Sequence, residues 1–402
     1  MNVRMRCFGL AMIKLAKNYV DSKRWFYHQN AIIKKSTKTG PILAFSLGSL
    51  FSFSSSSKSE SYNDCYEFMS EPITPINELV ENVKKGSMRH LFELFVLQVQ
   101  REFCMGLQSM ETKYTDEIDD EKIKHFQSDR WVRKEGGGGI TCIMQDSSVF
   151  EKAGVNISVV HGLLPPQAAA QMRSRGKSIS ETDTLNFYAV GVSSVVHPRN
   201  PNVPTLHFNF RYFEIEAPGN ERWWWFGGGT DMTPYILNES DVKHFHRLLK
   251  QACDKHDSKY YPQFKQWCDK YFFITHRGES RGVGGLFFDD IDYPDQPKAF
   301  AFIKDCARVL VPSYIPIIDR NTTKPYSYAD RQWQLLRRGR YVEFNLIYDR
   351  GTKFGLMTPG ARYESILMSL PLTARWEYQH QIEPDSKEYA LMEILKNPRE
   401  WV

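Results

Sequence analysis

The chain has 402 residues, of which 42% are hydrophobic and 25% are charged, proportions that are typical of a folded globular protein. The formal net charge of +5 is unevenly distributed, because residues 1–59 hold ten lysines and arginines but a single acid, whereas the remainder holds 42 basic and 46 acidic residues. A body with a net charge of −4 argues against general nucleic-acid binding, which needs a basic field around the phosphates.

The first 59 residues have the composition of a mitochondrial presequence, with basic residues spread among apolar ones and hardly any acid. An apolar run over 41–53 follows, and it is too short to span a bilayer comfortably. We expect 1–59 to be a cleaved or disordered targeting and sorting presequence that directs the protein to the mitochondrial intermembrane space. A peripheral association with the inner mitochondrial membrane stays open, as does a disordered leader whose apolar patch is accidental.

Seven cysteines are scattered along the chain without a C-x-x-C pair. An odd, unclustered set argues against a disulfide framework and against a zinc or iron–sulfur site. We expect most of these cysteines to be core residues.

From about residue 72 to the C-terminus no repeat or low-complexity stretch interrupts the sequence, which favours one domain over 72–402. Apolar residues near the 3.6-residue period predict a helix over 76–110, followed by a polar surface segment. Aromatic and β-branched runs predict strands over 187–197, 206–216, 223–226, 283–288 and 341–348. Further helices are predicted from an N-cap at Ser240 to about 256, and over 297–310, 363–368 and 387–396. This order indicates an α+β fold, a large antiparallel sheet covered by α-helices.

The predicted strand at 205–213 has an unusual polar face. Side chains alternate along a strand, so the apolar ones share one face while His207, Asn209 and Arg211 share the other. By the same rule Ser193 and His197 lie on one face of the preceding strand. Such a face can simply be solvated, but a titratable group, an amide and a fixed cation in a row are less usual there. We therefore interpret this face as functional.

Four bulky aromatic residues over 223–226 precede a predicted glycine loop, 227–229, which leads to Asp231. Glycines let the backbone approach a ligand closely. The loop lacks the pattern of a phosphate-binding loop, so nucleotide binding is not expected. Asp231 fits equally well as a site carboxylate and as a turn or helix-cap residue ahead of Pro234.

The histidines leave a metal site open as an alternative. His207 and His276 with Asp231 supply the two-histidine, one-carboxylate set of iron oxygenases, although their spacing matches no local ligand motif. His246 lies on an apolar helical stripe, so we expect it in the core.

Seven arginines between Arg331 and Arg375 accompany only three acids in that segment. Planar guanidinium groups suit the binding of carboxylates. Any one of these arginines can instead pair with an acid elsewhere in the chain, but the group as a whole indicates a polyanionic ligand. Together with the aromatic residues, it predicts an aromatic-lined pocket for a polyanionic, partly apolar molecule.

Long strings distributed in order from about residue 72 to the C-terminus resemble the oxygen-dependent coproporphyrinogen oxidase family. They are EGGGG at 135–139, VFEKAGVN at 149–156, GVSSVVHP at 191–198, HFNFRYF at 207–213, WWFGGGTDMTP at 224–234, HRGE at 276–279, the segment 337–353, and SLPLTARW at 369–376. The resemblance implies a catalytic domain over 72–402 that forms a homodimer. It implies the oxidative decarboxylation of two propionates of coproporphyrinogen III to vinyl groups. The product is protoporphyrinogen IX in haem biosynthesis, CO2 and hydrogen peroxide are released, and no metal or organic cofactor is needed.

The resemblance also implies roles for residues. His207 is expected to be the proton donor, and our mechanistic hypothesis adds Asp231 as a catalytic residue that accepts hydrogen bonds from the pyrrole N–H groups. Substrate contacts are expected at Ser193, Asn209, Phe210, Arg211, Gly360, Ala361 and Arg362. Dimer contacts are expected at Tyr341, Phe344, Asn345 and Arg350.

Two other functions stay open. One is a metal-dependent oxygenase that uses His207, Asp231 and His276. The other is a non-catalytic porphyrin carrier, which would need the same pocket but neither His207 nor Asp231.

Overall fold

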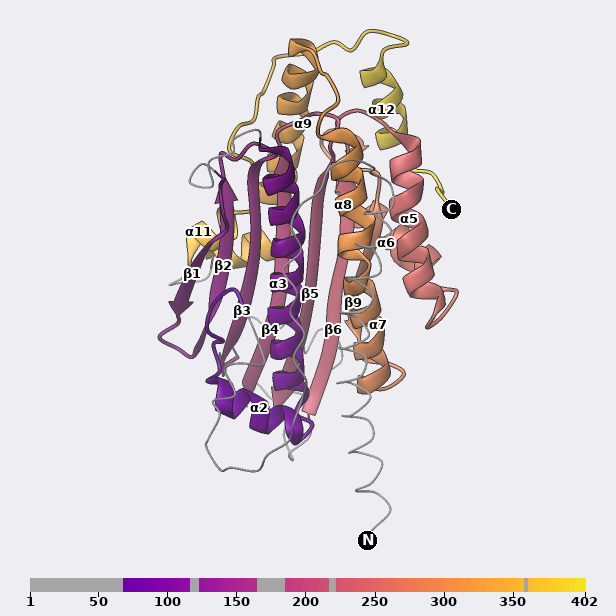
Figure 1. The fold of residues 1–402 in the computed structure, drawn as a ribbon. Helices are drawn as coiled ribbons and strands as arrows, with labels where there is room; N and C mark the ends of the chain where they lie inside the picture. The colour runs from indigo at the N-terminus through magenta and orange to yellow at the C-terminus, as the bar shows by residue number, and fades with distance from the viewer. Residues whose placement is uncertain (1–67, 116–122, 165–184, 217–221, 358–360) are drawn as a thin grey trace, which may run out of the picture. The chain divides into compact units, whose positions relative to one another are not determined.

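A seven-stranded sheet in the order β1-β2-β3-β4-β5-β6-β9 dominates the structure, and every neighbouring pair is antiparallel (Figure 1). The structure is a computed structural model that describes residues 68–115, 123–164, 185–216, 222–357 and 361–402. The predicted presequence over 1–59 lies outside these residues. The strands are β1 Gln127–Val132, β2 Gly137–Gln145, β3 Phe150–Leu163, β4 Asn186–Pro198, β5 Thr205–Glu216, β6 Arg222–Thr233 and β9 Gly285–Ile291, with a separate pair, β7 Phe273–Ile274 and β8 Glu279–Ser280.

Helices lie on both faces of the sheet. In Figure 1, α3, α8 and α7 lie in front of the strands, and α9 and α11 lie behind them. The helices are α2 Ile76–Lys84, α3 Met88–Tyr114, α5 Glu239–Asp254, α6 Tyr260–Tyr271, α7 Gln296–Arg308, α8 Leu310–Asn321, α9 Tyr328–Ile347, α10 Arg350–Met357, α11 Tyr363–Leu367 and α12 Lys387–Lys396. The predicted α+β fold, a large antiparallel sheet covered by α-helices, is confirmed.

The core lies between α3 and the strands behind it. Phe208 of β5 packs edge-on against Phe103 of α3 with ring centroids 4.9 Å apart, and Phe92 contacts Tyr212 and Phe226 with tilted rings at 5.9 and 5.6 Å. These side chains come from alternate positions of their strands, so the opposite face of the same strands is free for polar residues.

Several predicted elements differ from those observed. The strand predicted over 341–348 is wrong, because these residues form the end of helix α9. The aromatic residues that suggested a strand recur at helical spacing, and a capping box between Ser327 and Asp330 begins the helix.

The predicted helix over 76–110 is two helices, interrupted at Gly86, whose φ of +80° suits glycine. The N-cap of α5 is Asn238 rather than Ser240.

The predicted glycine loop is also wrong, because β6 continues through it to Thr233. A Cβ atom on Gly228 would lie 2.5 Å from the carbonyl oxygen of Asn209, so the glycines allow close pairing of β5 and β6 instead of a turn.

Among the residues that the structure describes, no helix is long and apolar enough to cross a membrane.

Candidate active site

The sheet face opposite α3 brings the predicted polar residues together. Paired residues of an antiparallel sheet lie side by side on the same face. The register of β4, β5 and β6 therefore stacks three cross-strand rows, which are Val195–His207–Asp231, Ser193–Asn209–Gly229 and Gly191–Arg211–Gly227. These residues are up to 40 positions apart in the sequence, but they lie on three adjacent strands of the sheet.

His207 and Asp231 form the first row and are in direct contact. The ring Nδ1 of His207 lies 2.7 Å from Oδ1 of Asp231. The Asp231 side chain is 2% exposed, whereas that of His207 is 23% exposed, so the imidazole lies between the carboxylate and the open face. The hypothesis that Asp231 meets a ligand directly therefore does not fit this arrangement, because the carboxylate is covered.

Arg281 lies beneath this pair and was not identified from the sequence. Its Nη2 donates to both oxygens of Asp231, at 2.9 and 2.8 Å, and its side chain is as buried as that of Asp231. Burial by itself raises the pKa of Asp231, but Arg281 and the hydrogen bond from His207 outweigh it, and the pKa lies below its ordinary value. Asp231 is therefore a carboxylate at neutral pH. No local pattern marks Arg281, since its partner is 50 residues away.

Arg281 is itself enclosed by residues of α6, α9 and the segments beside them. Its guanidinium carbon lies 4.1, 4.4 and 4.8 Å from the ring centroids of Phe272, Tyr341 and Phe344. Its Nη1 donates to Oδ1 of Asn345 at 3.0 Å. Three of the four predicted dimer contacts, Tyr341, Phe344 and Asn345, are thus buried within the single chain, and their part in a dimer stays a prediction. Only Arg350 of that set is exposed.

The ion pair determines where the His207 proton lies. An ionised Asp231 accepts only, so Nδ1 of His207 carries a hydrogen and donates it. The other ring nitrogen, Nε2, has no hydrogen-bond partner among the described residues. It is the atom through which His207 can exchange a proton with a molecule on the open face.

Arg211 is held in place by two acceptors. Its Nη1 donates to Oδ1 of Asn209 at 2.7 Å, and its Nη2 lies 2.9 Å from Oδ1 of Asp289 on β9. Gly227 makes room for this pair, because a Cβ there would lie 2.6 Å from the Asp289 oxygen and 2.8 Å from Nε of Arg211. The Arg211 side chain is still 35% exposed and can meet an anion. Phe210, by contrast, is fully buried on the opposite face, so its side chain does not reach this site.

Aromatic rings continue the same face beyond Arg211. The ring of Phe213 stacks on that of Trp225 at 4.6 Å, and Phe187 stacks on Phe213 at 5.7 Å. All three are half-buried. The face thus passes from a histidine–aspartate pair, through an arginine row with glycines on either side, to an aromatic surface.

The segment after α10 covers the β1–β3 half of this face. Gly360 lies outside the described residues. Arg362 pairs with Asp129, which the register places in the same cross-strand row as Ser193. Ser365 of α11 contacts Thr141 Oγ1 at 2.8 Å and accepts a hydrogen bond from Asn156 at 2.6 Å. Arg362, and Ala361 beside it, therefore lie over the same face as His207 but toward the β1 edge of the sheet.

A family model for coproporphyrinogen III oxidase matches residues 91–401. The chain belongs to the coproporphyrinogen III oxidase family. It is 60% identical over 335 residues to a protein of Drosophila melanogaster named oxygen-dependent coproporphyrinogen-III oxidase, and 83% of each chain is covered. It is 55% identical over 339 residues to the human protein named oxygen-dependent coproporphyrinogen-III oxidase, mitochondrial, with 84% of this chain and 72% of the human one covered. It is 48% identical over 335 residues to the Glycine max enzyme named as chloroplastic, with 82% and 84% covered.

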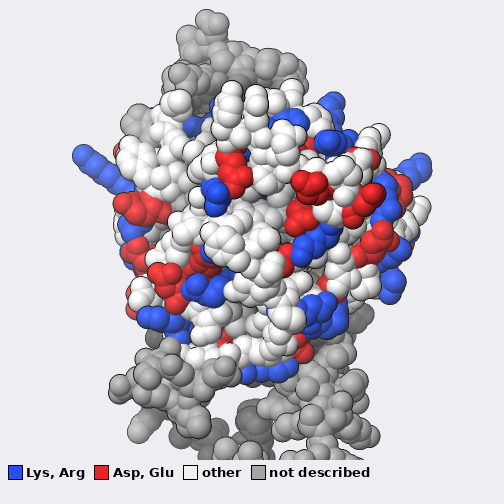
Figure 2. All heavy atoms as spheres, turned by 90° about the horizontal axis from the view of Figure 1, so that it is seen from above, with Lys and Arg blue, Asp and Glu red and all other residues white. Residues whose placement is uncertain are grey.

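Most of the arginines in the 331–375 segment of this coproporphyrinogen oxidase family member are used inside the protein. All seven have a carboxylate partner: Arg331 and Arg338 share Glu151, while Arg337 pairs with Glu279, Arg340 with Glu343, Arg350 with Asp289, Arg362 with Asp129, and Arg375 with Glu377. Figure 2 shows the same intermixing, with blue and red side chains alternating over the face seen from above. As a group these arginines are therefore largely structural. Arg362 lies over the β1 end of the described sheet face, and Arg350 shares Asp289 with Arg211.

The metal set left open by the sequence is not assembled. His276 contacts Oε2 of Glu343 at 2.8 Å and the hydroxyl of Tyr348 at 2.7 Å instead of facing Asp231. In the part of the chain that the structure describes, no three His, Cys, Asp or Glu side chains are grouped to hold a metal ion. His246 is a core residue, as predicted, and contacts Tyr261 and the carbonyl of Val283.

Proposed function

We propose that this chain catalyses the oxygen-dependent conversion of two propionates of coproporphyrinogen III into vinyl groups, giving protoporphyrinogen IX in haem biosynthesis. The observation that carries the proposal is the row of half-buried polar groups on β4 and β5, with the buried Asp231–Arg281 pair directly behind His207. Family membership and the name of the 60% identical relative agree with it.

The chemistry of the face fits a tetra-anionic macrocycle of pyrrole rings. The guanidinium of Arg211, the amide of Asn209 and the hydroxyl of Ser193 can bind a propionate carboxylate. Gly227 has no side chain, which leaves room for the Arg211 guanidinium and Asp289, and Gly191 adds no side chain on the other side of Arg211. Phe213 and Trp225 offer a surface for pyrrole rings. Ala361 and Arg362, toward the β1 edge of the same face, complete the proposed contacts. Gly360 is also a proposed contact, but it lies outside the described residues.

The reaction balances with one O2 for each propionate. The propionate loses CO2 and, from its β-carbon, a hydrogen with two electrons, which leaves the vinyl group. These two electrons reduce O2, and with the transferred hydrogen and one further proton they give hydrogen peroxide. Each turnover therefore takes up one proton, which Nε2 of protonated His207 is placed to supply. The electron-rich pyrrole of the substrate is the reductant, so we propose that no metal or organic cofactor takes part.

Asp231 acts through His207 in this proposal. Its ionised carboxylate stabilises the imidazolium and orients the ring so that Nε2 faces the substrate. Arg281 keeps the carboxylate ionised although it is buried.

Product stoichiometry tests this function. Anaerobically prepared coproporphyrinogen III is mixed with metal-stripped protein and O2, and CO2, O2 and hydrogen peroxide are counted. Two CO2 per protoporphyrinogen IX, unaffected by chelators, with one O2 consumed and one peroxide formed per CO2, are expected. Activity that needs added iron or copper would establish the metal-dependent oxygenase, and binding without O2 uptake would establish the carrier.

We further propose that the protein is a homodimer that forms through the apolar residues exposed on the 341–377 segment. Leu346 and Ile347 at the end of α9, Met357 of α10 and Trp376 are exposed, and Arg350 lies among them in the sequence. Exposed large apolar residues in one segment are typical of an association surface. The contacts therefore differ from the buried side chains that the sequence suggested.

We also propose a mitochondrial location, in the intermembrane space, with residues 1–59 as the targeting presequence. Their basic, acid-poor composition supports it, and the rat, mouse and human relatives are named mitochondrial. Peripheral association with the inner membrane is part of this proposal. Fusing residues 1–59 to a fluorescent protein tests it: import followed by protease resistance that is lost on opening the outer membrane is expected, and cytosolic fluorescence would contradict it.

A further inference from the structure

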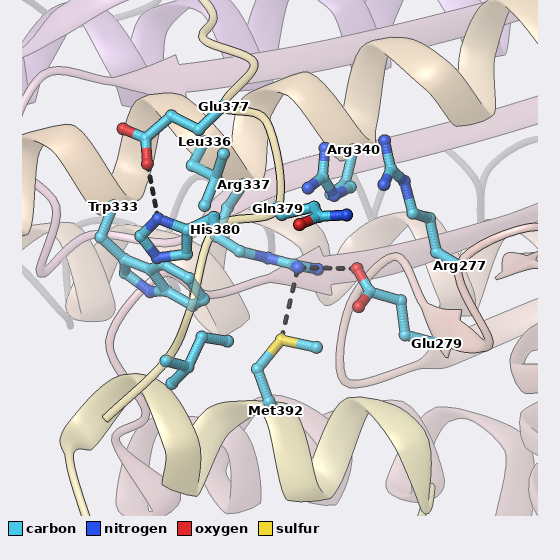
Figure 3. A pocket seen from close by; sticks show the side chains of 11 residues that line it. Arg277, Glu279, Trp333, Leu336, Arg337, Arg340, Glu377, Gln379, His380 and Met392 are labelled. Atoms are coloured by element: carbon cyan, nitrogen blue, oxygen red, sulfur yellow. Dashed lines mark hydrogen bonds and ion pairs between the residues drawn. The ribbon is translucent and has the colours of Figure 1, made fainter. Parts of the chain in front are cut away.

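A basic cavity lies on a different side of α9 from Arg281. Its volume is about 210 Å³, and it is bordered by α9, α12, β8 and the segment 377–382 (Figure 3). Trp333, Arg337 and Arg340 line it, and they recur at helical spacing along one face of α9. Tyr341 and Asn345, which contact Arg281, lie on another face of the same helix. The cavity is therefore separate from the candidate active site.

Three arginines surround this cavity, and their carboxylate partners are shared. Oε1 of Glu279 accepts from Nη1 of Arg337 at 2.6 Å. Glu343 alone serves both Arg277, at 2.9 and 2.7 Å, and Nη1 of Arg340, at 3.1 Å. Glu377, which also lines the cavity, pairs with Arg375 and His380 instead. Glu279 and Glu343 are thus the two acids that pair with the three guanidinium groups.

Arg337 has a buried donor that no described atom accepts. Its side chain is 4% exposed, yet Nη2 has no hydrogen-bond partner among the described residues. Buried donors of native proteins are almost always satisfied, so an unpaired one at a cavity points to a missing acceptor. Figure 3 shows its guanidinium group near those of Arg277 and Arg340, with the Gln379 amide among them.

The electrostatics of Arg340 agree with this picture. Burial lowers the pKa of its guanidinium, and the charges of Arg277 and Arg337 lower it further, although Glu343 opposes them. A bound anion would relieve this repulsion among like charges.

We propose that this cavity binds a small oxyanion, a phosphate or a short dicarboxylate, between Arg337 and Arg340. Guanidinium groups present paired N–H donors that match the oxygens of both kinds of anion. The anion supplies the acceptor that Nη2 of Arg337 lacks, and it joins α9 to the 377–382 segment through Gln379. An anion that binds only the folded protein also stabilises it by mass action.

Inorganic phosphate is the first probe. Unfolding of the full chain is followed by heating at increasing phosphate, with sodium chloride added to hold ionic strength constant, and calorimetry measures the affinity. We expect a saturable rise in the unfolding temperature. Arg340→Gln should weaken phosphate affinity about tenfold, since it removes a charged hydrogen-bond partner. Succinate in place of phosphate distinguishes the two anions by the larger saturable effect.

Matched substitutions separate this cavity from other basic sites. Arg211→Gln, on the sheet face, and Arg308→Gln, an exposed arginine of α7, should both retain the phosphate response. Gln379→Glu, which places a carboxylate among the arginines, should raise the unfolding temperature without phosphate and abolish the response. A response that is equal in the wild type and in Arg340→Gln, that is lost in Arg211→Gln, or that is absent from the wild type would overturn the proposal.

Discussion

Asp231 and Arg281 form a buried ion pair in which a single guanidinium nitrogen donates to both carboxylate oxygens, at 2.9 and 2.8 Å, and His207 is bonded to the outer side of the same carboxylate. The role of each of these three side chains depends on the other two. Without Arg281 the buried carboxylate would take up a proton, and without Asp231 the imidazole would lose both its orientation and its stabilising charge.

Breaking this ion pair should affect stability and activity differently. Arg281→Met leaves Asp231 buried without its cation and should lower the free energy of unfolding by about 3–5 kcal/mol. The double variant Arg281→Met with Asp231→Asn should regain part of this loss, because no uncompensated charge remains, but it should stay inactive. Denaturant unfolding measures the free energy of unfolding, and single-turnover assays measure the activity. Full activity of the double variant would contradict the role given to the pair.

His207→Gln should lower kcat about 10²–10⁴-fold while the affinity for the substrate changes little, because the ring supplies a proton and not a binding charge. Rapid-quench kinetics separates the two. His256→Gln, a histidine that pairs with Asp305, is the control and should leave kcat unchanged. Equal losses of affinity and of kcat in His207→Gln would show that the residue binds the substrate instead.

Gly227→Ala should raise KM about tenfold with little change in the unfolding temperature. The added methyl group would lie 2.6 Å from the Asp289 oxygen and 2.8 Å from Arg211 Nε, and both are ends of side chains that can move apart. Gly106→Ala in α3 meets only ordinary contacts with Ile315 and serves as the control. An unchanged KM in Gly227→Ala would argue that the position of Arg211 does not matter for substrate binding.

Glu151 should contribute acid-dependent stability. Burial raises the pKa of its carboxyl, but Arg338, Thr373 and Arg331 lower it to about 2. A depressed pKa stabilises the fold above the unfolded value of about 4.3, and this stability is lost as the pH falls toward 2. The full effect is on the order of 3 kcal/mol. Unfolding measured between pH 5 and about 2 should therefore show a weaker pH dependence in Glu151→Gln than in the wild type or in the exposed control Glu383→Gln.

Ile347→Asp and Met357→Glu should convert the proposed dimer into a monomer without unfolding it, because both side chains are exposed in the single chain. Sedimentation velocity measures the oligomeric state. Met105→Glu changes an equally exposed apolar residue on α3 and should leave the dimer intact. A dimer that persists in both segment variants would place the interface elsewhere.

Patterns that depend on neighbours in the chain predicted much of this structure. The two-residue period of β5 separates the side chains of the core from His207, Asn209 and Arg211, and the apolar run of α12 marks its bounds at Lys387–Lys396. Where two local signals competed, sequence reasoning failed. Aromatic residues at the end of α9 resemble a strand until the helix that begins at Ser327 is seen to continue through them.

The sequence by itself determined which residues share a face of a strand and to which family the chain is similar, because both follow from the order of neighbouring residues. Only the tertiary structure decided which charges meet. Arg281 pairs with Asp231, 50 residues away in the sequence, and Arg338 of α9 pairs with Glu151 of β3. Arginines that looked available for a ligand are therefore neutralised within the chain. A charge acts over a few ångströms of space and not along the sequence, and the folded backbone alone sets those distances.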